Sequence, residues 1–242
     1  MSIKSHSIEI SGIPVEVVRK DIKNLHLGVY PPNGRVRAAV PLRLSDDAVR
    51  LAVSTRIGWV RRQQRQFQSQ DRQSEREMIS GETHYYRGRR YRLNVVESAK
   101  AVGVRRRTNN RLELRVPYGS SRAAKEKILF DWYRQSLREQ AALLIGKWAK
   151  KIGVQVNEWS IRRMKTKWGT CNKSAGRILL NLELAKKSPA CLELIVVHEL
   201  IHLRHRHHDE NFLHEMTKHL SNWRSVKQQL NRAPLSHSRW DY

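Results

Sequence analysis

Residues 196–203 are Val-Val-His-Glu-Leu-Ile-His-Leu and place two histidines four positions apart, His198 and His202, with Glu199 beside the first. Residues four apart on an α-helix lie on one face, so both imidazoles can reach one ion at about 2.0–2.1 Å. Glu199 stands where a carboxylate can take a proton from a water that the metal activates. We therefore predict a metal centre with His198 and His202 as ligands and Glu199 as the catalytic base.

The surroundings of this pattern support a helix. Ser188 and Pro189 suit the N-cap and first position of a helix, and an apolar face leads into the histidines. That face is formed by Leu192, Ile195, Val196 and Val197. The chain has 11 histidines, so a pair at this spacing can also arise by chance as an ordinary core or surface pair. The capped apolar setting favours the metal.

A catalytic zinc ion usually takes a third protein ligand and keeps one position open. The downstream candidates are His205, His207, His208, Asp209, Glu210 and His214. In a continuous helix His205 would lie roughly 10.5 Å along the axis from His198, too far to share an ion that His202 also binds. Asp209 suits the N-cap of a following helix, so the chain should break just before it. We choose His208 as third ligand, with His207 second and an exposed histidine-rich turn as the alternative.

The charge of the chain is strongly positive. Lys and Arg total 47 against 22 acidic residues in 242, a net charge of +25. Such a balance favours binding to a polyanion such as nucleic acid, or it describes a solvated surface. Residues 84–91 alternate aromatic residues with arginine, which suits backbone contacts with base stacking but also an ordinary exposed strand.

The expected location is the cytoplasm. The first residues, MSIKSHSIEISG, contain no apolar run, and no segment approaches 18 uninterrupted apolar residues, so we expect neither a secretory signal nor a membrane span. Cys171 and Cys191 have no paired spacing and are interpreted as packing residues in a reducing compartment.

The N-terminal part predicts short strands followed by a helix. Residues 8–10, 13–18 and 23–29 suit strands, and Pro31-Pro32-Asn33-Gly34 predicts a turn before a strand over 35–40. Pro41 should end that strand, and Ser45 should begin a helix that continues through Val60. Residues 61–76 are rich in Gln, Arg and Ser and form either a helix extension or a linker.

A second block follows the same order. A strand over 102–106, a turn at 108–110 and a strand over 111–116 precede Pro117, and Ser120-Ser121 opens a long helix through Trp148. The block is either an internal repeat or a common way to join a hairpin to a helix. Further strands are predicted over 154–161 and 177–182.

Several of these segments resemble one family, the YgjP-like metallopeptidases. They are residues 163–171 (RMKTKWGTC), 176–181 (GRILLN), 196–203, and His208 followed at the fourth position by Phe212. The resemblance covers most of the chain and implies one Zn²⁺ held by His198, His202 and His208, with Glu199 catalytic. The family is related to the WLM and SprT-like zincins, some of which cleave proteins crosslinked to DNA. Thr170 replaces the family's common serine, and residues 203–207 lack its usual proline or glycine.

A zincin also needs a strand along which an extended peptide substrate can pair. We predict that this strand consists of Arg177, Ile178, Leu179, Leu180 and Asn181. The alternative is a paired interior strand. Trp168 is predicted to anchor the core rather than to contact substrate.

These observations predict an α+β protein in two parts. Residues 1–80 would form a β-rich hairpin region with a helix, and residues 81–242 a minimal zincin-like metallopeptidase core. The predicted function is zinc-dependent peptide hydrolysis, with nucleic-acid-associated proteins as candidate substrates and no membrane partner. The competing class is a DNA- or RNA-binding protein with a structural or silent zinc site. A structural site normally has four protein ligands and no use for Glu199, which favours the enzyme.

Overall fold

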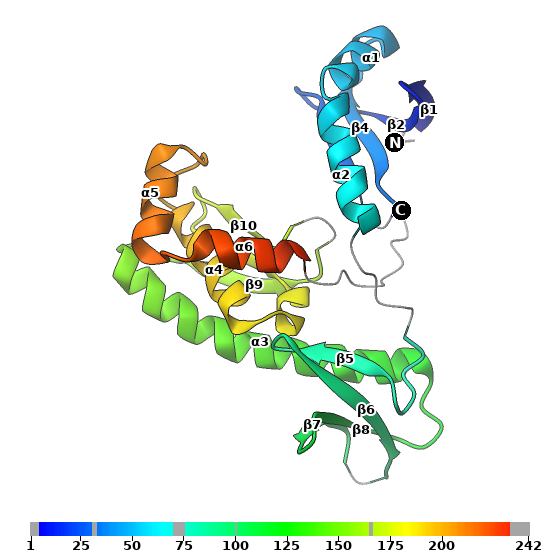
Figure 1. Ribbon diagram of the computed structural model, residues 1–242, viewed down its shortest axis with the longest axis vertical. Coiled ribbons are helices and arrows are strands. Elements are labelled where there is room, and N and C mark those ends of the chain that lie inside the picture. Colours follow the sequence, from blue (N-terminus) through cyan, green and yellow to red (C-terminus); the bar gives the residue numbers. More distant parts are fainter. Residues whose placement is uncertain (1–4, 31–32, 70–75, 100, 165–166, 233–242) are drawn as a thin grey trace. The chain divides into compact units, whose positions relative to one another are not determined.

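The computed structural model describes residues 5–30, 33–69, 76–99, 101–164 and 167–232, which form two compact units on either side of residues 70–75 (Figure 1). The first unit combines helices with one small sheet and the second combines helices with two, so the predicted α+β class is confirmed. The division into domains after residue 80 stays a prediction. No helix in these ranges is long and apolar enough to cross a membrane.

The first unit is a four-stranded sheet with two helices. Its sheet has the order β1-β2-β4-β3, in which two antiparallel hairpin pairs are joined by the parallel central pair β2–β4. The elements are β1 (Ser5–Ile10), β2 (Ile13–Lys20), β3 (His26–Tyr30), β4 (Arg35–Pro41), α1 (Asp46–Ser54) and α2 (Ile57–Ser69). Pro31 and Pro32 of the predicted turn lie outside the described residues.

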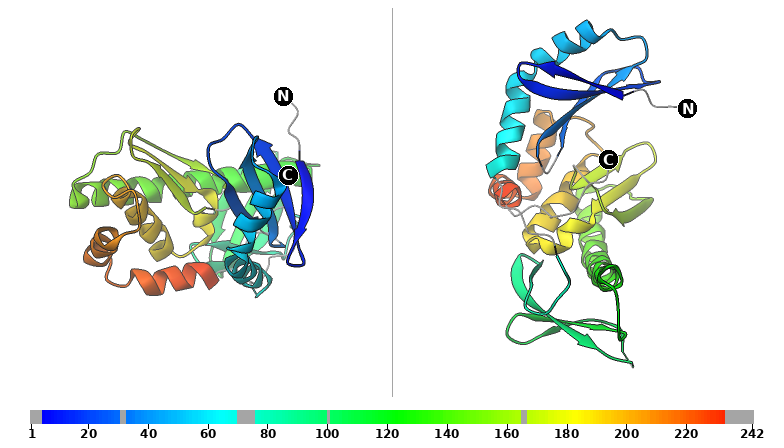
Figure 2. Two further views of the ribbon diagram at one scale, coloured as in Figure 1. Left: turned by 90° about the horizontal axis from the view of Figure 1, so that it is seen from above. Right: turned by 90° about the vertical axis from the view of Figure 1, so that its right-hand side faces the viewer.

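Small aliphatic side chains build the core of this unit. Val15, Val17 and Ala38 alternate inward from the sheet against Val49 and Val53 of α1. Both helices lie along one face of the strands in the right-hand view of Figure 2. Alternation on the central strands therefore determines which face the helices cover.

The single helix predicted from Ser45 through Val60 is wrong, because two helices are present. Ser45 does cap α1, accepting a hydrogen bond from the Ala48 amide at 3.3 Å. The chain then tightens at Arg56, whose amide bonds the Val53 carbonyl three residues back at 2.9 Å. This hydrogen bond spans three residues instead of four and ends α1 at Ser54. Helix α2 then extends into the segment 61–76 as far as Ser69.

The second unit begins with a sheet of the same topology. Its order is β5-β6-β8-β7, again with two antiparallel pairs around a parallel pair, β6–β8. The strands are β5 (Thr83–Tyr86), β6 (Arg89–Glu97), β7 (Gly103–Arg107) and β8 (Arg111–Val116). The similar order of sequence signals in the two blocks thus reflects a repeated arrangement of strands.

Residues 84–91 form the β5–β6 hairpin, and one face of this hairpin is buried. His84, Tyr86 and Tyr91 are buried, and the Tyr86 hydroxyl lies 2.6 Å from the Ser136 hydroxyl of the next helix. The alternation is that of a strand with one face in the core, which is the other interpretation given by the sequence.

Helix α3 (Arg122–Ile152) connects the two ends of the second unit. Ser121 caps it, and Gly153 ends it in the left-handed conformation at φ 75°. At 31 residues it is roughly 46 Å long, and it runs from the β5–β8 sheet to α4 and α5 (Figure 1). A single buried stripe follows the helix from Leu129 to its end: Leu129, Tyr133, Leu137, Ala141, Ile145, Trp148 and Ile152.

The remaining elements surround one buried helix, α4 (Pro189–Ile201). A three-stranded sheet with the order β10-β11-β9 packs against it, and two further helices follow it in sequence. These elements are β9 (Glu158–Arg162), β10 (Gly169–Asn172), β11 (Arg177–Asn181), the 3₁₀ helix η1 (Leu182–Lys186), α5 (Glu210–His219) and α6 (Trp223–Arg232). The strand predicted over 154–161 begins later, at Glu158.

Candidate metal centre

Helix α4 places His198 and Glu199 at the centre of the second unit. Ser188 accepts a hydrogen bond from the Cys191 amide at 3.4 Å, and Pro189 occupies the first turn, as predicted. Nine of its residues are buried, including Glu199. Because the helix is enclosed on most sides, the carboxylate is held within the protein interior rather than on its surface.

His202 is oriented by the chain that follows the helix. It is the C-cap of α4, and its ring Nδ1 lies 2.9 Å from the carbonyl oxygen of His205. A carbonyl only accepts hydrogen bonds, so Nδ1 must carry the proton. This leaves the Nε2 atom of His202 as the free lone pair, which is the state a metal ligand requires.

His208 returns to the helix because α5 begins directly after it. Asp209 caps α5 by accepting a hydrogen bond from the Phe212 amide at 2.9 Å. The amides of Leu203 and Arg204 each bond a carbonyl three residues back, which turns the chain at the end of α4. The predicted break before Asp209 is therefore present, and it directs His208 toward His198.

The three Nε2 atoms meet at one point. They lie 3.2 Å apart for His198 and His202, and 3.1 Å apart for both pairs that include His208. Three nitrogens at about 2.0–2.1 Å from a tetrahedral ion would be about 3.3 Å from one another. The cluster therefore has close to the spacing that a single tetrahedral ion imposes. Among the described residues no fourth His, Cys, Asp or Glu joins it.

Phe212 supports the cluster from α5. Its ring centroid lies 5.0, 4.8 and 4.7 Å from the rings of His198, His202 and His208. An aromatic ring in contact with all three imidazoles restricts their rotation and excludes water from that side. Phe212 therefore helps to hold the three imidazoles together.

The electrostatic setting favours the neutral form of His198 and His208. Burial, together with the neighbouring His202 and His208, lowers the pKa of His198 to about 3. Burial also lowers the pKa of His208, with a contribution from the charge of His202. Neutral imidazoles near pH 7 are available to bind a cation without first losing a proton.

Glu199 lies beside the cluster and against the backbone of β10. Burial raises the pKa of its carboxyl to about 8, and the charge of Lys167 opposes that shift. A Cβ atom placed on Gly169 would lie 2.5 Å from Oε1 of Glu199. Gly169 is thus needed for close approach, and the tryptophan-glycine pair of the sequence marks this contact.

The prediction that residues 177–181 form a free substrate-binding strand is wrong. These residues form β11, which pairs antiparallel with β10 on one side and parallel with β9 on the other. Both edges of its backbone are occupied, so no peptide can add to it. The edge strand next to Glu199 is β10.

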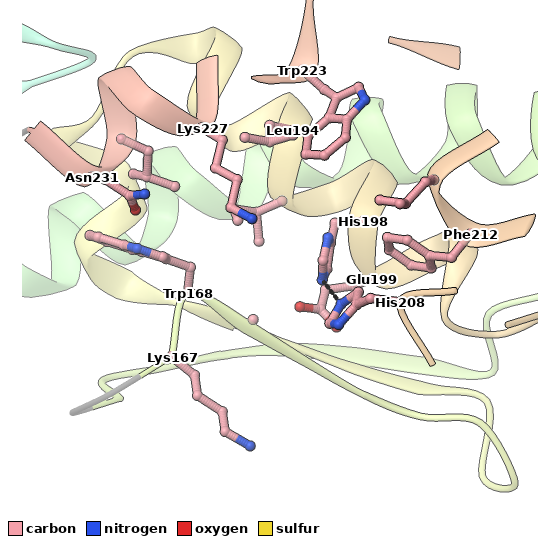
Figure 3. A pocket seen from close by; sticks show the side chains of 14 residues that line it. Lys167, Trp168, Leu194, His198, Glu199, His208, Phe212, Trp223, Lys227 and Asn231 are labelled. Carbon is pink, nitrogen blue, oxygen red and sulfur yellow. Dashed lines mark hydrogen bonds between the residues drawn. The ribbon is translucent and has the colours of Figure 1, made fainter. Parts of the chain in front are cut away.

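A cavity of about 410 Å³ opens beside the cluster. Trp168, predicted as a core anchor, is only partly buried, and it lines this cavity with His198 and Glu199 (Figure 3). Trp223 and Lys227 of α6 line it as well, and sequence reasoning missed both because α6 carries no motif.

Both cysteines are free, as expected for packing residues, and Cys171 lies in β10 near the charge of Glu199.

An interior helix with two histidines and a glutamate, and a third histidine after a chain reversal, defines the metal-dependent hydrolase class of site. The chain belongs to the YgjP-like family, whose metallopeptidase-domain model matches residues 23–233. The family predicted from the sequence motifs is confirmed, and the protein is a metallopeptidase by family.

Other comparisons add little. Among solved structures, the crystal structure of the metallopeptidase zymogen abylysin of Pyrococcus abyssi is similar at 20% identity and a TM-score of 0.35, covering 37% of this chain and 90% of that one. No curated protein matches the sequence.

Proposed function

We propose that this protein is a zinc-dependent peptidase in which His198, His202 and His208 hold one Zn²⁺ and Glu199 is the general base. The observation that carries the proposal is the meeting of three Nε2 atoms at 3.1–3.2 Å beside a buried carboxylate. Membership of a metallopeptidase family supports the reaction type.

Zinc fits the donors better than the other common divalent ions. Three imidazole nitrogens suit zinc, whereas calcium and magnesium prefer oxygen ligands. Three protein ligands also leave one position for water or substrate, as in catalytic rather than structural zinc sites. This donor set disfavours the competing idea of a closed, structural zinc site in a nucleic-acid-binding protein.

The residues of the chain divide the chemistry between them. Zinc, when bound, supplies a Lewis acid that polarises the scissile carbonyl and makes a water molecule more acidic. Glu199 accepts the proton from the attacking water and passes it to the leaving amine. Its buried setting keeps its pKa near neutrality, which suits a group that must both accept and release a proton, and a nearby dication favours its ionised form.

We propose that β10 is the strand that pairs with an extended substrate. It is an edge strand whose only partner among the described residues is β11. Its first residue, Gly169, touches Glu199, so a peptide added along its free edge would lie beside the general base. The proposed substrate strand is therefore β10, the neighbour in the sheet of β11, which the sequence had predicted.

The decisive experiment compares two glutamate-to-glutamine variants on α4. Glu199→Gln should retain one zinc ion per chain and lose peptide hydrolysis by at least about a hundredfold. Glu193→Gln is the control, because Glu193 sits on the same helix and bonds Lys147 and Trp148 instead. Unchanged turnover in Glu199→Gln, or purified protein that binds no zinc, would overturn the proposal.

A specific surface supports a second function, binding to nucleic acid. On the β5–β8 sheet, the face opposite the buried Leu112 and Leu114 carries six arginines and one glutamate; we name this the arginine face. Its arginines are Arg90, Arg92, Arg105, Arg107, Arg111 and Arg115. Glu113, the one acid among them, bonds Arg107 and Arg115.

The spacing of this face suits a phosphate backbone. Arg92, Arg111 and Arg107 occupy neighbouring positions across three strands, because register pairs Arg92 with Arg111 and Arg111 with Arg107. Side chains opposite one another in a sheet are about 5 Å apart. Because Arg107 pairs with Glu113, the like charges of Arg92 and Arg111 are the ones that repel at neutral pH unless an anion lies over them. We propose that this face recruits the peptidase to nucleic acid or to protein that is bound to nucleic acid. We also propose that the protein works in the cytoplasm.

A further inference from the structure

The cavity beside the metal centre has an apolar wall. The wall is formed by Leu194 and Ile195 of α4, Trp223 and Leu230 of α6, and Trp168 before β10. A volume of about 410 Å³ is enough for a large side chain and part of the backbone that carries it. It therefore has the size and lining to hold a residue of the substrate next to the scissile bond.

Two lysines line this cavity, Lys167 and Lys227, and Lys167 extends away from the other labelled side chains in Figure 3. Lys227 extends from the helix toward His198 and lies beside Leu194 (Figure 3). Its ammonium is 5.7 Å from the ring centroid of Trp223, which lines the same cavity. Lys227 thus faces the reacting end of the cavity as well as the solvent.

The cavity does not supply a carboxylate partner for this cation. Glu199 is the one acidic residue that lines it, and its position beside Gly169 serves the metal centre. The nearby acids of α4 and α5 pair elsewhere, Glu193 with Lys147 and Glu215 with Arg204 and Lys218. Within the described residues, no carboxylate forms an ion pair with Lys227.

We propose that this cavity is a specificity pocket for a substrate residue that bears a carboxylate, with Lys227 as the group that pairs with it. The inference rests on the proposed peptidase function and names its substrate class. Apolar walls would hold the methylene groups of the residue, while the carboxylate would reach the ammonium and offset its charge. The carboxylate can belong to a glutamate or aspartate side chain or to the C-terminus of the peptide.

The expected selectivity is modest because Lys227 is exposed to solvent. An ion pair in such a setting changes affinity by about fivefold between a carboxylate and its neutral amide. That difference in affinity is large enough to measure with matched peptides. The shape of the pocket cannot account for it, because Glu and Gln have nearly the same volume.

The test uses fluorogenic peptides that are identical except for Glu or Gln at one position, each with a free or an amidated C-terminus. Wild type should favour the carboxylate in kcat/KM by about fivefold. Lys227→Met should lose this preference, so that its kcat/KM values for the carboxylate and amide peptides become equal. Arg224→Met is the matched control, because Arg224 stacks on Trp223 from the same helix and does not line the cavity. The control should keep the preference.

A binding measurement separates failure of this inference from failure of the proposed function. Zinc-loaded Glu199→Gln should bind the same peptides without turnover. The fluorescence of Trp168 and Trp223 measures this binding. If the carboxylate peptide binds more tightly and Lys227→Met abolishes this difference, the result supports the proposed pocket. This holds even if wild type cleaves no peptide. Equal binding of the two peptides, or a preference that survives Lys227→Met, overturns it. So does an equal loss of kcat for both peptides, which would make Lys227 a stabiliser of the transition state instead.

Discussion

The carboxylate of Glu199 rests on the backbone of Gly169, so closely that a Cβ atom there would lie 2.5 Å from Oε1. Real side chains do not approach to this distance, so the smallest possible residue is required at position 169. The contact joins the first residue of edge strand β10 to Glu199 on α4, the proposed general base. It therefore fixes the base and the proposed substrate strand relative to one another.

Substitution of this glycine should uncouple metal binding from catalysis. Gly169→Ala should force the Glu199 carboxylate to move and reduce peptide hydrolysis on the order of a hundredfold, while the three histidines keep their zinc. Activity and zinc content measured on the same sample check this. Gly146→Ala is the control, because a Cβ atom at Gly146 meets nothing within 4 Å. Full activity in Gly169→Ala would show that the contact has no catalytic importance.

The third ligand can be tested against its neighbour in the sequence. His208→Ala should weaken zinc binding by at least tenfold, because Nε2 of His208 completes the cluster with His198 and His202. His207→Ala should leave the zinc affinity unchanged, since His207 is exposed and lies outside the cluster. Titration with a chelating indicator measures both. The opposite ranking would transfer the ligand role to His207.

The buried His84 should make stability depend on pH. Burial lowers its pKa below the ordinary value of 6.5, and Arg76 and Lys186 lower it further, while its hydrogen bond to Glu82 opposes them. Below about pH 6.5 the unfolded chain therefore binds a proton at this site that the folded protein does not. Its contribution to stability is present above pH 6.5 and is lost as the pH falls.

Urea unfolding at pH 7.5 and pH 5.5 checks this prediction. The free energy of unfolding should fall more between these two values for wild type than for His84→Gln, because the other histidines are common to both proteins. Equal losses in the two proteins would mean that His84 has no lowered pKa in the folded state.

The arginine face should determine how binding to DNA depends on salt. Replacing Arg90, Arg92 and Arg105 by glutamine should reduce the slope of log K against log salt by about 2–3, because each lost phosphate contact accounts for about 0.9. Removing three cations elsewhere on the second unit, Lys127, Lys150 and Arg224, controls for net charge. Equal effects of the two triple variants would assign the binding to the overall charge of +25 rather than to this face.

The sequence by itself determined the parts of the site that depend on local structure. His198 and His202 lie on one face because helical spacing places them there, and Ser188 and Pro189 begin the helix as their chemistry predicts. His208 followed from the same kind of argument, because Asp209 had to begin a new helix. Each of these inferences needs only a few neighbouring residues.

Only the tertiary structure decided which strand has a free edge and what lines the cavity. β11 has the composition of a substrate strand but lies between β10 and β9, and hydrogen bonding between distant strands leaves no mark on the sequence of either. Lys227 belongs to a helix without a motif and reaches the site because α6 packs against α4. Local periodicity specifies the faces of an element, whereas the neighbours of each face depend on how the whole core packs.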